Sequence, residues 1–250
     1  MHAFNQHISM NNPTHAYIQE YIEKLSKQLG KKKIRLLDFG CGSGSFLRTI
    51  PISSIESYTG YDINVDSIRE ADRLYKRNKK IHFYTLNQKK PFTIRNNDNV
   101  DIVLMIGVIQ YLTDRQIASA LSLCKKVIKK NGFIIISTCS DHWFYRLIDL
   151  YGYVSPHRFI SSSKIKFLLN NAGFQMNIIN EIGLIIAPVF SYCLSLLFDG
   201  LDILFRTKEK GSLGVFGEWA RRITAPLILI EYQSPLNFGY TKIIIAQPKV

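Results

Sequence analysis

Cysteine is scarce in this chain, and its pattern excludes two kinds of framework. The four cysteines, Cys41, Cys124, Cys139 and Cys193, are scattered, with no CxxC pair and no histidine at metal-ligand spacing. A disulfide scaffold and a zinc site are therefore not indicated, and we expect no metal and a reducing, cytoplasmic environment. The first residues also lack a basic stretch followed by an apolar run, so no signal peptide is predicted.

The sequence also lacks internal repeats and low-complexity tracts, and its composition suits a single core. Of its 250 residues, 46% are hydrophobic, which is enough for one elaborated domain. The formal net charge is +13, but the lysines form separate short clusters, several of them at predicted helix ends. We interpret most of this excess as a solvated surface and the remainder as suited to an anionic membrane or a phosphorylated substrate.

Apolar segments and helical patterns alternate along the chain. Strands are predicted at residues 33–40, 57–64, 80–87, 99–109, 132–139, 175–183 and 241–248. Helices are predicted from Asn12 to Gly30, from Asn64 to 78, from the Thr113–Gln116 capping box to 132, and from 161 to Gly173. A further helix is expected directly after the first strand. This order predicts an α/β fold with a doubly wound, mostly parallel seven-stranded sheet.

Three glycines, Gly40, Gly42 and Gly44, follow the first predicted strand. Glycine permits positive φ and lets a ligand approach the main chain, and ligands of such sheets bind where the strands end. Asp38 precedes the loop, and Asp62 ends the second strand 62 − 44 = 18 residues beyond it. An acid at that position is placed to accept both hydroxyls of an adenosine ribose.

Two alternatives for this loop stay open: a glycine-rich turn without a ligand, and a dinucleotide site. The dinucleotide fingerprint G-x-G-x-x-G requires glycine at position 45, where Ser45 stands, which disfavours a nicotinamide-dependent oxidoreductase.

The motifs resemble those of class I S-adenosylmethionine-dependent methyltransferases. "LLDFGCGSG" matches the D/E-x-G-x-G-x-G motif, "GYDIN" the acidic second-strand motif, and "VDIVLMIGVIQYLTD" the fourth-strand segment. The resemblance covers Leu36 to Gly183 and points to the small-molecule branch that includes ubiquinone-type O-methyltransferases. It implies a Rossmann-like fold, S-adenosylmethionine as cofactor, and an S-adenosylmethionine-binding core at residues 34–183 that follows an N-terminal helical arm at 1–33.

The resemblance also implies a role for each cofactor-binding residue. Gly40, Cys41, Gly42 and Gly44 would accommodate the amino acid part, Asp38 would organise their loop, Asp62 would bind the ribose, Ile63 would lie against adenine, and Gly107 with Val108 would border the methionine side. Simple core packing for Ile63 and Val108, and a loop cap for Asp38, remain the alternatives.

Two positions depart from the family pattern. Asn87 is the only candidate to hold the adenine amine, where family members often carry an acid, and Tyr111 stands where a histidine is common. These departures keep open a catalytically silent, methyltransferase-fold binding protein.

Methyl transfer to a hydroxyl requires in-line positioning and removal of a proton, for which histidine is the usual base. His157 and His142 both follow the fifth strand, and His157 in "SPHRF" is the better candidate. The alternative for either is a histidine that orders a loop or caps a helix.

The acceptor is expected to be a small or lipid-like molecule methylated at oxygen. The base-amine motif N/D-P-P-Y/F/W and the Pro-Cys nucleophile are both missing from "IGVIQY", so nucleic acid is disfavoured, with ribose-directed enzymes left open. Asp101 and Asp114 are poorly spaced for a metal-dependent catechol-type site.

A helical, apolar insertion is predicted at residues 184–232, before the final strand of the core at 233–250. Residues 182–198 are 198 − 182 + 1 = 17 residues without a charge, which is short for a membrane span. Nearby basic residues are Arg206, Lys208, Lys210, Arg221 and Arg222. We expect an in-plane element on the inner face of a membrane, with a substrate lid and a homodimer surface as alternatives.

Overall fold

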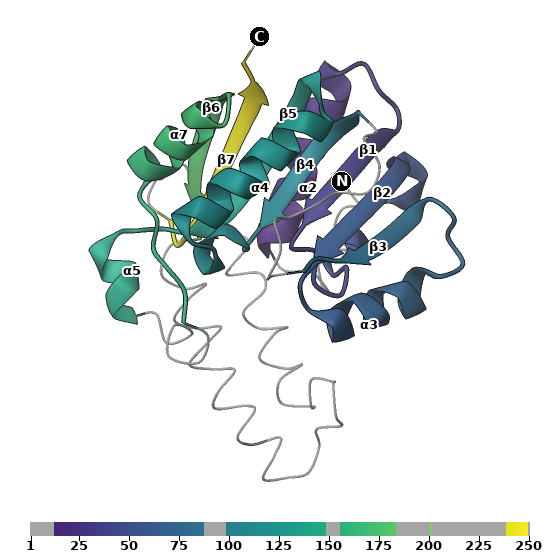
Figure 1. Cartoon of the computed structure of the whole chain (residues 1–250), viewed down its shortest axis with the longest axis horizontal. Coiled ribbons are helices and arrows are strands. Elements are labelled where there is room, and N and C mark those ends of the chain that lie inside the picture. Colours follow the sequence, from purple (N-terminus) through teal and green to yellow (C-terminus); the bar gives the residue numbers. More distant parts are fainter. Residues whose placement is uncertain (1–12, 88–98, 149–155, 184–200, 202–238, 250) are drawn as a thin grey trace.

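The computed structural model describes residues 13–87, 99–148, 156–183, 201 and 239–249. Seven strands form one sheet in the order β3-β2-β1-β4-β5-β7-β6 (Figure 1). They are β1 (Ile34–Phe39), β2 (Ile55–Asp62), β3 (Ile81–Thr85), β4 (Val100–Ile106), β5 (Ile128–Cys139), β6 (Phe174–Ile182) and β7 (Thr241–Pro248). Only β7 runs antiparallel to its neighbours, β5 and β6, among these strands. The predicted α/β, Rossmann-like, mostly parallel seven-stranded sheet is confirmed.

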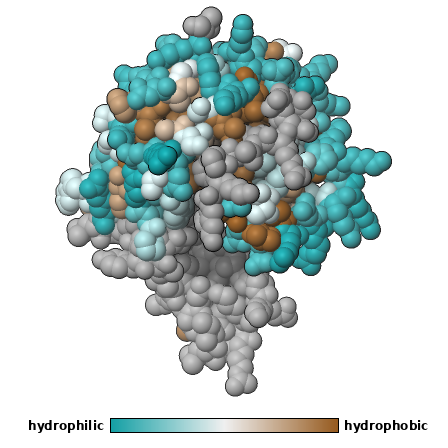
Figure 2. Space-filling model, in the orientation of Figure 1, coloured by the Kyte–Doolittle hydropathy of each residue, from teal (hydrophilic) through white to brown (hydrophobic). Residues whose placement is uncertain are grey.

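Helices cover both faces of this sheet. The α-helices are α2 (Pro13–Gln28), α3 (Val65–Tyr75), α4 (Asp114–Val127), α5 (Trp143–Ile148) and α7 (Ser162–Asn171). The 3-10 helices are η1 (Phe46–Arg48), η2 (Ile52–Ser54) and η3 (Ile109–Tyr111). Helices α4 and α7 pack their apolar side chains on the face that carries Leu37 and Phe39, whereas α2 and α3 pack on the face that carries Leu36. In Figure 2, hydrophilic side chains cover most of the described periphery seen from this side.

Local capping signals correctly predicted two helix starts. The Asn64 side chain accepts hydrogen bonds from the backbone N–H groups of Asp66 and Ser67 at the start of α3. Thr113 and Gln116 form the predicted capping box at the start of α4. Each cap satisfies backbone donors that the first helical turn cannot pair.

Two predicted helix positions were wrong. The segment between β1 and β2 holds only η1 and η2 and no α-helix, because Pro51 disfavours the helical conformation at Ile50 and few residues separate the loop from β2. Helix α4 ends at Val127 instead of continuing to Gly132, since Ile128 is already extended and begins β5. Consecutive β-branched residues at this junction favour the strand.

The predicted insertion at residues 184–232 lies outside the described residues, apart from Leu201, as does the predicted cap Asn12. Within the described part of the chain, no helix has the length and apolar character needed to cross a bilayer.

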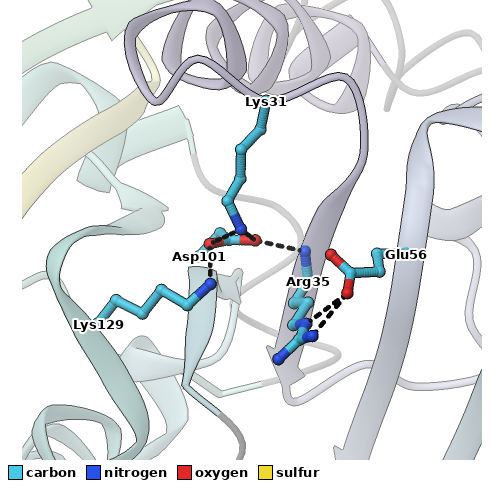
Figure 3. Close-up of polar contacts among 5 residues, drawn as sticks. All are labelled: Lys31, Arg35, Glu56, Asp101 and Lys129. Atoms are coloured by element: carbon cyan, nitrogen blue, oxygen red, sulfur yellow. Dashed lines mark hydrogen bonds and ion pairs between the residues drawn. The ribbon is translucent and has the colours of Figure 1, made fainter.

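A buried carboxylate ties four elements together at the edge where the parallel strands begin (Figure 3). Asp101 at the start of β4 is fully buried and accepts hydrogen bonds from Lys31, from Lys129 and from the backbone N–H of Arg35. The Lys31 and Lys129 ammonium groups each lie 2.7 Å from Asp101 Oδ1. These contacts join the segment after α2 to β1, β4 and β5.

Candidate functional site

A cavity of about 370 Å³ lies at the opposite edge, where the parallel strands end. Its lining comes from the ends of β1, β2, β3 and β4 together with η3 and the start of α4. The lining residues are Phe39, Gly40, Asp62, Ile63, Leu86, Gly107, Val108, Tyr111, Leu112 and Gln116. The cavity therefore brings together five of the ten predicted cofactor residues from three separate segments, the ends of β1, β2 and β4.

Asp62 is the only acidic residue among the described residues of the lining, and its carboxylate accepts hydrogen bonds at both oxygens. Oδ2 accepts a hydrogen bond from the backbone N–H of Gly42 at 2.7 Å, and Oδ1 accepts one from the N–H of Asn64 at 2.8 Å. A carboxylate offers about four lone-pair sites, so roughly two remain for a ligand. These bonds supply the partners that a charge at a strand end requires, and they orient Asp62 at the cavity.

The glycine loop leaves space that a side chain would fill. Gly42 has φ +53°, and a Cβ added there would meet no atom within 4 Å; Gly107, with φ +63°, is equally open. Gly40 has φ +84°, and its added Cβ would lie 2.6 Å from Cγ2 of Val108. Glycine is thus required at Gly40 by both backbone conformation and close packing.

Substitution Gly40→Ala should destabilise the protein and weaken its binding of S-adenosylhomocysteine. Positive φ costs an L-residue about 1–2 kcal/mol, and the methyl group must also displace Val108 in the cavity wall. Gly30→Ala is the matched control, since Gly30 has φ +65° with open space around it, away from the cavity. Unfolding in urea and titration calorimetry would measure both effects; unchanged binding in Gly40→Ala would contradict the role of the loop.

Asp38 lies in β1 and does not line the cavity. Its side chain is buried, and Oδ2 accepts a hydrogen bond from the Tyr58 hydroxyl at 2.7 Å. Oδ1 has no hydrogen-bond partner among the described residues. Burial raises the pKa of the Asp38 carboxyl to about 7; the Tyr58 hydrogen bond opposes this shift and the nearby Asp62 charge adds to it.

The remaining predicted cofactor residues lie around the cavity without lining it. Cys41 is buried, and its Sγ would lie 2.7 Å from a Cβ added to Gly60, so it packs into the core. Burial raises the pKa of the Cys41 thiol far above its usual range, which keeps it neutral and unreactive. Gly44 packs against Phe83, and the exposed Asn87 follows Leu86, which is the lining residue of that segment.

Sequence reasoning missed several lining residues, namely Phe39, Leu86, Tyr111, Leu112 and Gln116. Tyr111 was noted only as a departure from the family pattern, and Gln116 only as a capping partner. Their nearness to the glycine loop follows from strand order, which places β4 beside β1.

His157 lies next to Tyr111, one of the residues that line the cavity. Its ring centroid is 6.1 Å from that of Tyr111, which is about half exposed. Arg158 fixes this segment, because its backbone N–H donates to the Gln110 carbonyl. Its guanidinium also donates to the Leu112 carbonyl and to the Asp114 carboxylate, and both of these bonds are 2.6 Å long. The structure thus brings His157 next to a lining residue, although His157 itself does not line the cavity.

His142 belongs to a different cluster, at the ends of β5 and β6 and the start of β7. Its Nε2 is 2.7 Å from Glu181 Oε2. Lys242 is fully buried, pairs closely with Asp141 and lies 3.8 Å from Glu181. In the described ranges, no three His, Cys, Asp or Glu side chains are grouped as metal ligands. His142 and His157 thus have different neighbours, Glu181 and Tyr145 for His142 and Tyr111 and Phe159 for His157.

The sequence matches a family described as a methyltransferase domain over residues 10–177. Because this match covers more than half of the chain, the protein belongs to the methyltransferase-domain family and is a class I S-adenosylmethionine-dependent methyltransferase by fold and sequence. The predicted cofactor, S-adenosylmethionine, is thereby confirmed. The sequence has no significant match among curated proteins.

Solved structures share the fold at low sequence identity. A S-adenosylmethionine-dependent methyltransferase from Clostridium acetobutylicum is similar with TM-score 0.60 and 9% identity, over 93% of this chain and 91% of that one. Magnesium protoporphyrin IX methyltransferase from Synechocystis, solved with bound SAH, has TM-score 0.56 and 13% identity, over 95% and 84%. The [4+2]-cyclase SpnF has TM-score 0.56 and 14% identity, over 93% and 81%.

Proposed function

We propose that the protein transfers the methyl group of S-adenosylmethionine to a hydroxyl oxygen of a small or lipid-like acceptor. The observation that carries the cofactor site is Asp62, whose carboxylate is fixed at the cavity by Gly42 and Asn64 with acceptor capacity to spare. Beside it, Gly42 and Gly107 leave the main chain open to a ligand. An acid for ribose hydroxyls and a backbone without side chains fit an adenosyl amino acid.

In this proposal, different described residues bind different parts of the cofactor. Asp62 would accept the ribose hydroxyls, and the apolar Ile63 and Leu86 would pack against adenine. Gly107 and Val108 would border the methionine side of the cofactor. Asp38, in β1 directly before the glycine loop, would support that loop. When bound, the cofactor supplies a methyl group on a sulfonium, which an acceptor oxygen takes by in-line displacement.

The acceptor hydroxyl must also lose its proton, and His157 is the residue we propose to receive it. Arg158 fixes the segment that holds His157 beside the lining residue Tyr111, which supports this choice. His142 is the second candidate, but its Nε2 already pairs with Glu181. If methyl transfer survives in His157→Gln and falls in His142→Gln, His142 would replace His157 as the proposed base.

Calorimetry tests the cofactor site directly. Asp62→Asn should weaken S-adenosylhomocysteine binding about 10- to 100-fold, because hydrogen bonds to a charged group contribute about 1.5–3 kcal/mol. Asp66→Asn is the matched control, since Asp66 lies in the exposed first turn of α3. Binding of NAD alone would overturn the assignment. Binding without methyl transfer to any acceptor would favour a silent member of this fold, which also hosts the SpnF cyclase chemistry.

We further propose that the protein works as a peripheral protein on the cytoplasmic face of a membrane, through its uncharged segment 182–198. Fractionation of the wild type beside a variant lacking residues 184–205 tests this. The wild type should partition with membranes and the deletion variant should not. Equal partition of both would contradict membrane contact and favour the lid or the homodimer surface.

A further inference from the structure

Helix α5 presents the most exposed large apolar side chain of the described residues. Trp143, its first residue, is 76% exposed. The Phe144 ring lies edge-on to it with centroids 6.1 Å apart, and the exposed Arg146 lies over the Phe159 ring at 5.5 Å. Trp143 and Arg146 lie about one helical turn apart in α5. An exposed indole is costly in water, but an indole with a basic side chain on the same helix suits a boundary between apolar and charged surroundings.

Tyr145 anchors α5 two residues after Trp143, so the exposure of Trp143 does not come from a frayed helix end. Tyr145 is fully buried, and its ring lies 5.7 Å from that of Tyr240 and 6.2 Å from that of His142. His142 is in turn paired with Glu181, while Asp141 pairs with the buried Lys242. The buried Tyr145 fixes which side of the helix faces the protein, and this leaves Trp143 directed outward.

Helix α5 lies at the same edge of the sheet as the cofactor cavity (Figure 1). It follows β5 directly. Its anchor, Tyr240, donates its backbone N–H to the Gly183 carbonyl and accepts the N–H of Ser140. Gly183 and Tyr240 flank the stretch whose sequence contains the uncharged residues up to 198. Through Tyr145 and Tyr240, helix α5 therefore lies next to both ends of that stretch.

We propose that α5 is a membrane-docking surface of the described fold, with Trp143 as an anchor in an anionic lipid interface and Arg146 at the headgroup phosphates. The proposal rests on the membrane contact proposed above and adds to it a defined orientation. Tryptophan favours the interface, and a nearby basic side chain gains from anionic headgroups. In this orientation the edge of the sheet that carries the cofactor cavity lies toward the lipid, which suits an acceptor delivered from the bilayer.

Charge alone would favour the opposite orientation of the protein on the membrane, so docking through α5 can be distinguished from a purely electrostatic contact. Exposed lysines gather where the parallel strands begin: Lys32 and Lys33 precede β1, and Lys79 and Lys80 precede β3. A purely electrostatic contact would use that edge and would weaken steeply in salt. A contact through Trp143 buries apolar surface and should persist in salt.

The test uses the full chain with Trp219→Phe, which leaves Trp143 as the single tryptophan. Adding phosphatidylglycerol vesicles should shift its emission to shorter wavelength, and brominated lipid should quench it, in 0.5 M salt as well. Trp143→Ala in the wild-type chain should weaken co-sedimentation with these vesicles about tenfold, as expected for loss of one buried aromatic side chain. Phe167→Ala, which removes the exposed aromatic of α7, should change nothing.

The outcomes separate this proposal from the broader one. If the protein co-sediments with vesicles but the Trp143 emission does not change, the proposal that α5 docks on the membrane is wrong and membrane contact by another surface stands. The same holds if co-sedimentation is lost completely in 0.5 M salt. No co-sedimentation of the wild type overturns both. S-adenosylhomocysteine binding should be equal in all variants, which shows that each is folded.

Discussion

Replacing Asp38 by asparagine should stabilise the cofactor-free protein at pH 8 and weaken its binding of S-adenosylhomocysteine. The Asp38 carboxylate is buried, with only the Tyr58 hydroxyl donating to it, and burial raises its pKa from 3.8 to about 7. The folded state thus holds this proton more tightly than the unfolded chain does. Stability falls as pH rises from about 4 to 7, and a shift of about three units corresponds to about 4 kcal/mol.

Asparagine keeps an oxygen for Tyr58 and carries no charge, so Asp38→Asn should lack this decline. Urea unfolding at pH 5 and pH 8 would show the free energy of unfolding of the variant exceeding that of the wild type at pH 8, by up to about 4 kcal/mol. Tyr58→Phe is the control, because it removes the hydrogen bond that lowers this pKa and should steepen the decline. Parallel pH profiles for wild type and Asp38→Asn would contradict the argument.

A charge kept at this cost to stability points to a role in binding. Oδ1 of Asp38 lacks a described hydrogen-bond partner, two residues before Gly40. If the carboxylate supports the glycine loop for the cofactor, Asp38→Asn should bind S-adenosylhomocysteine roughly tenfold more weakly, as for the loss of a charged hydrogen-bond acceptor. Gain of stability without loss of affinity would assign Asp38 no part in the site.

The sequence predicted those features that depend on short-range patterns. The caps at Asn64 and Thr113 lie within a few residues of the backbone groups that they serve. The glycine loop directly follows β1, and the acid Asp62 directly ends β2. The resemblance implied that Gly107 and Val108 belong to the same site as Gly40, and all three line the cavity. Periodicity also identified all seven strands, with the start of β5 misplaced by four residues.

Features that depend on long-range pairing could not be predicted. Arg158 meets Asp114 across 44 residues, and Lys242 meets Asp141 across 101, and no local pattern marks either pair. Lys242 in particular sits in an apolar strand, where its charge alone gives no sign that two carboxylates surround it. The sequence shows Asp101 only as a carboxylate poorly spaced for a metal, whereas its partners Lys31, Arg35 and Lys129 lie in three other segments.

Asp101 is where we expect the largest loss of stability from a single substitution. Asp101→Ala removes the acceptor for two lysine ammonium groups and for the N–H of Arg35. Breaking a buried ion pair by removing one partner costs about 3–5 kcal/mol, because the remaining charges stay without compensation. Glu56→Gln is the matched control at the same edge, since Glu56 pairs with Arg35 at the surface and such pairs contribute less than about 1 kcal/mol.

The hydrogen bonds to Asp101 also determine how the free energy of unfolding changes with pH. Burial alone would raise the pKa of Asp101, but hydrogen bonds from Lys129, Lys31 and the Arg35 backbone outweigh burial and hold it below its usual 3.8. The stability that this carboxylate contributes is therefore present above about pH 4 and is lost as pH falls through the lowered pKa. Acid unfolding should be shallower in Asp101→Ala than in the wild type. Because Asp101 lies at the edge away from the cofactor cavity, the folded variant should bind S-adenosylhomocysteine as the wild type does, and weaker binding would show that this edge also shapes the site.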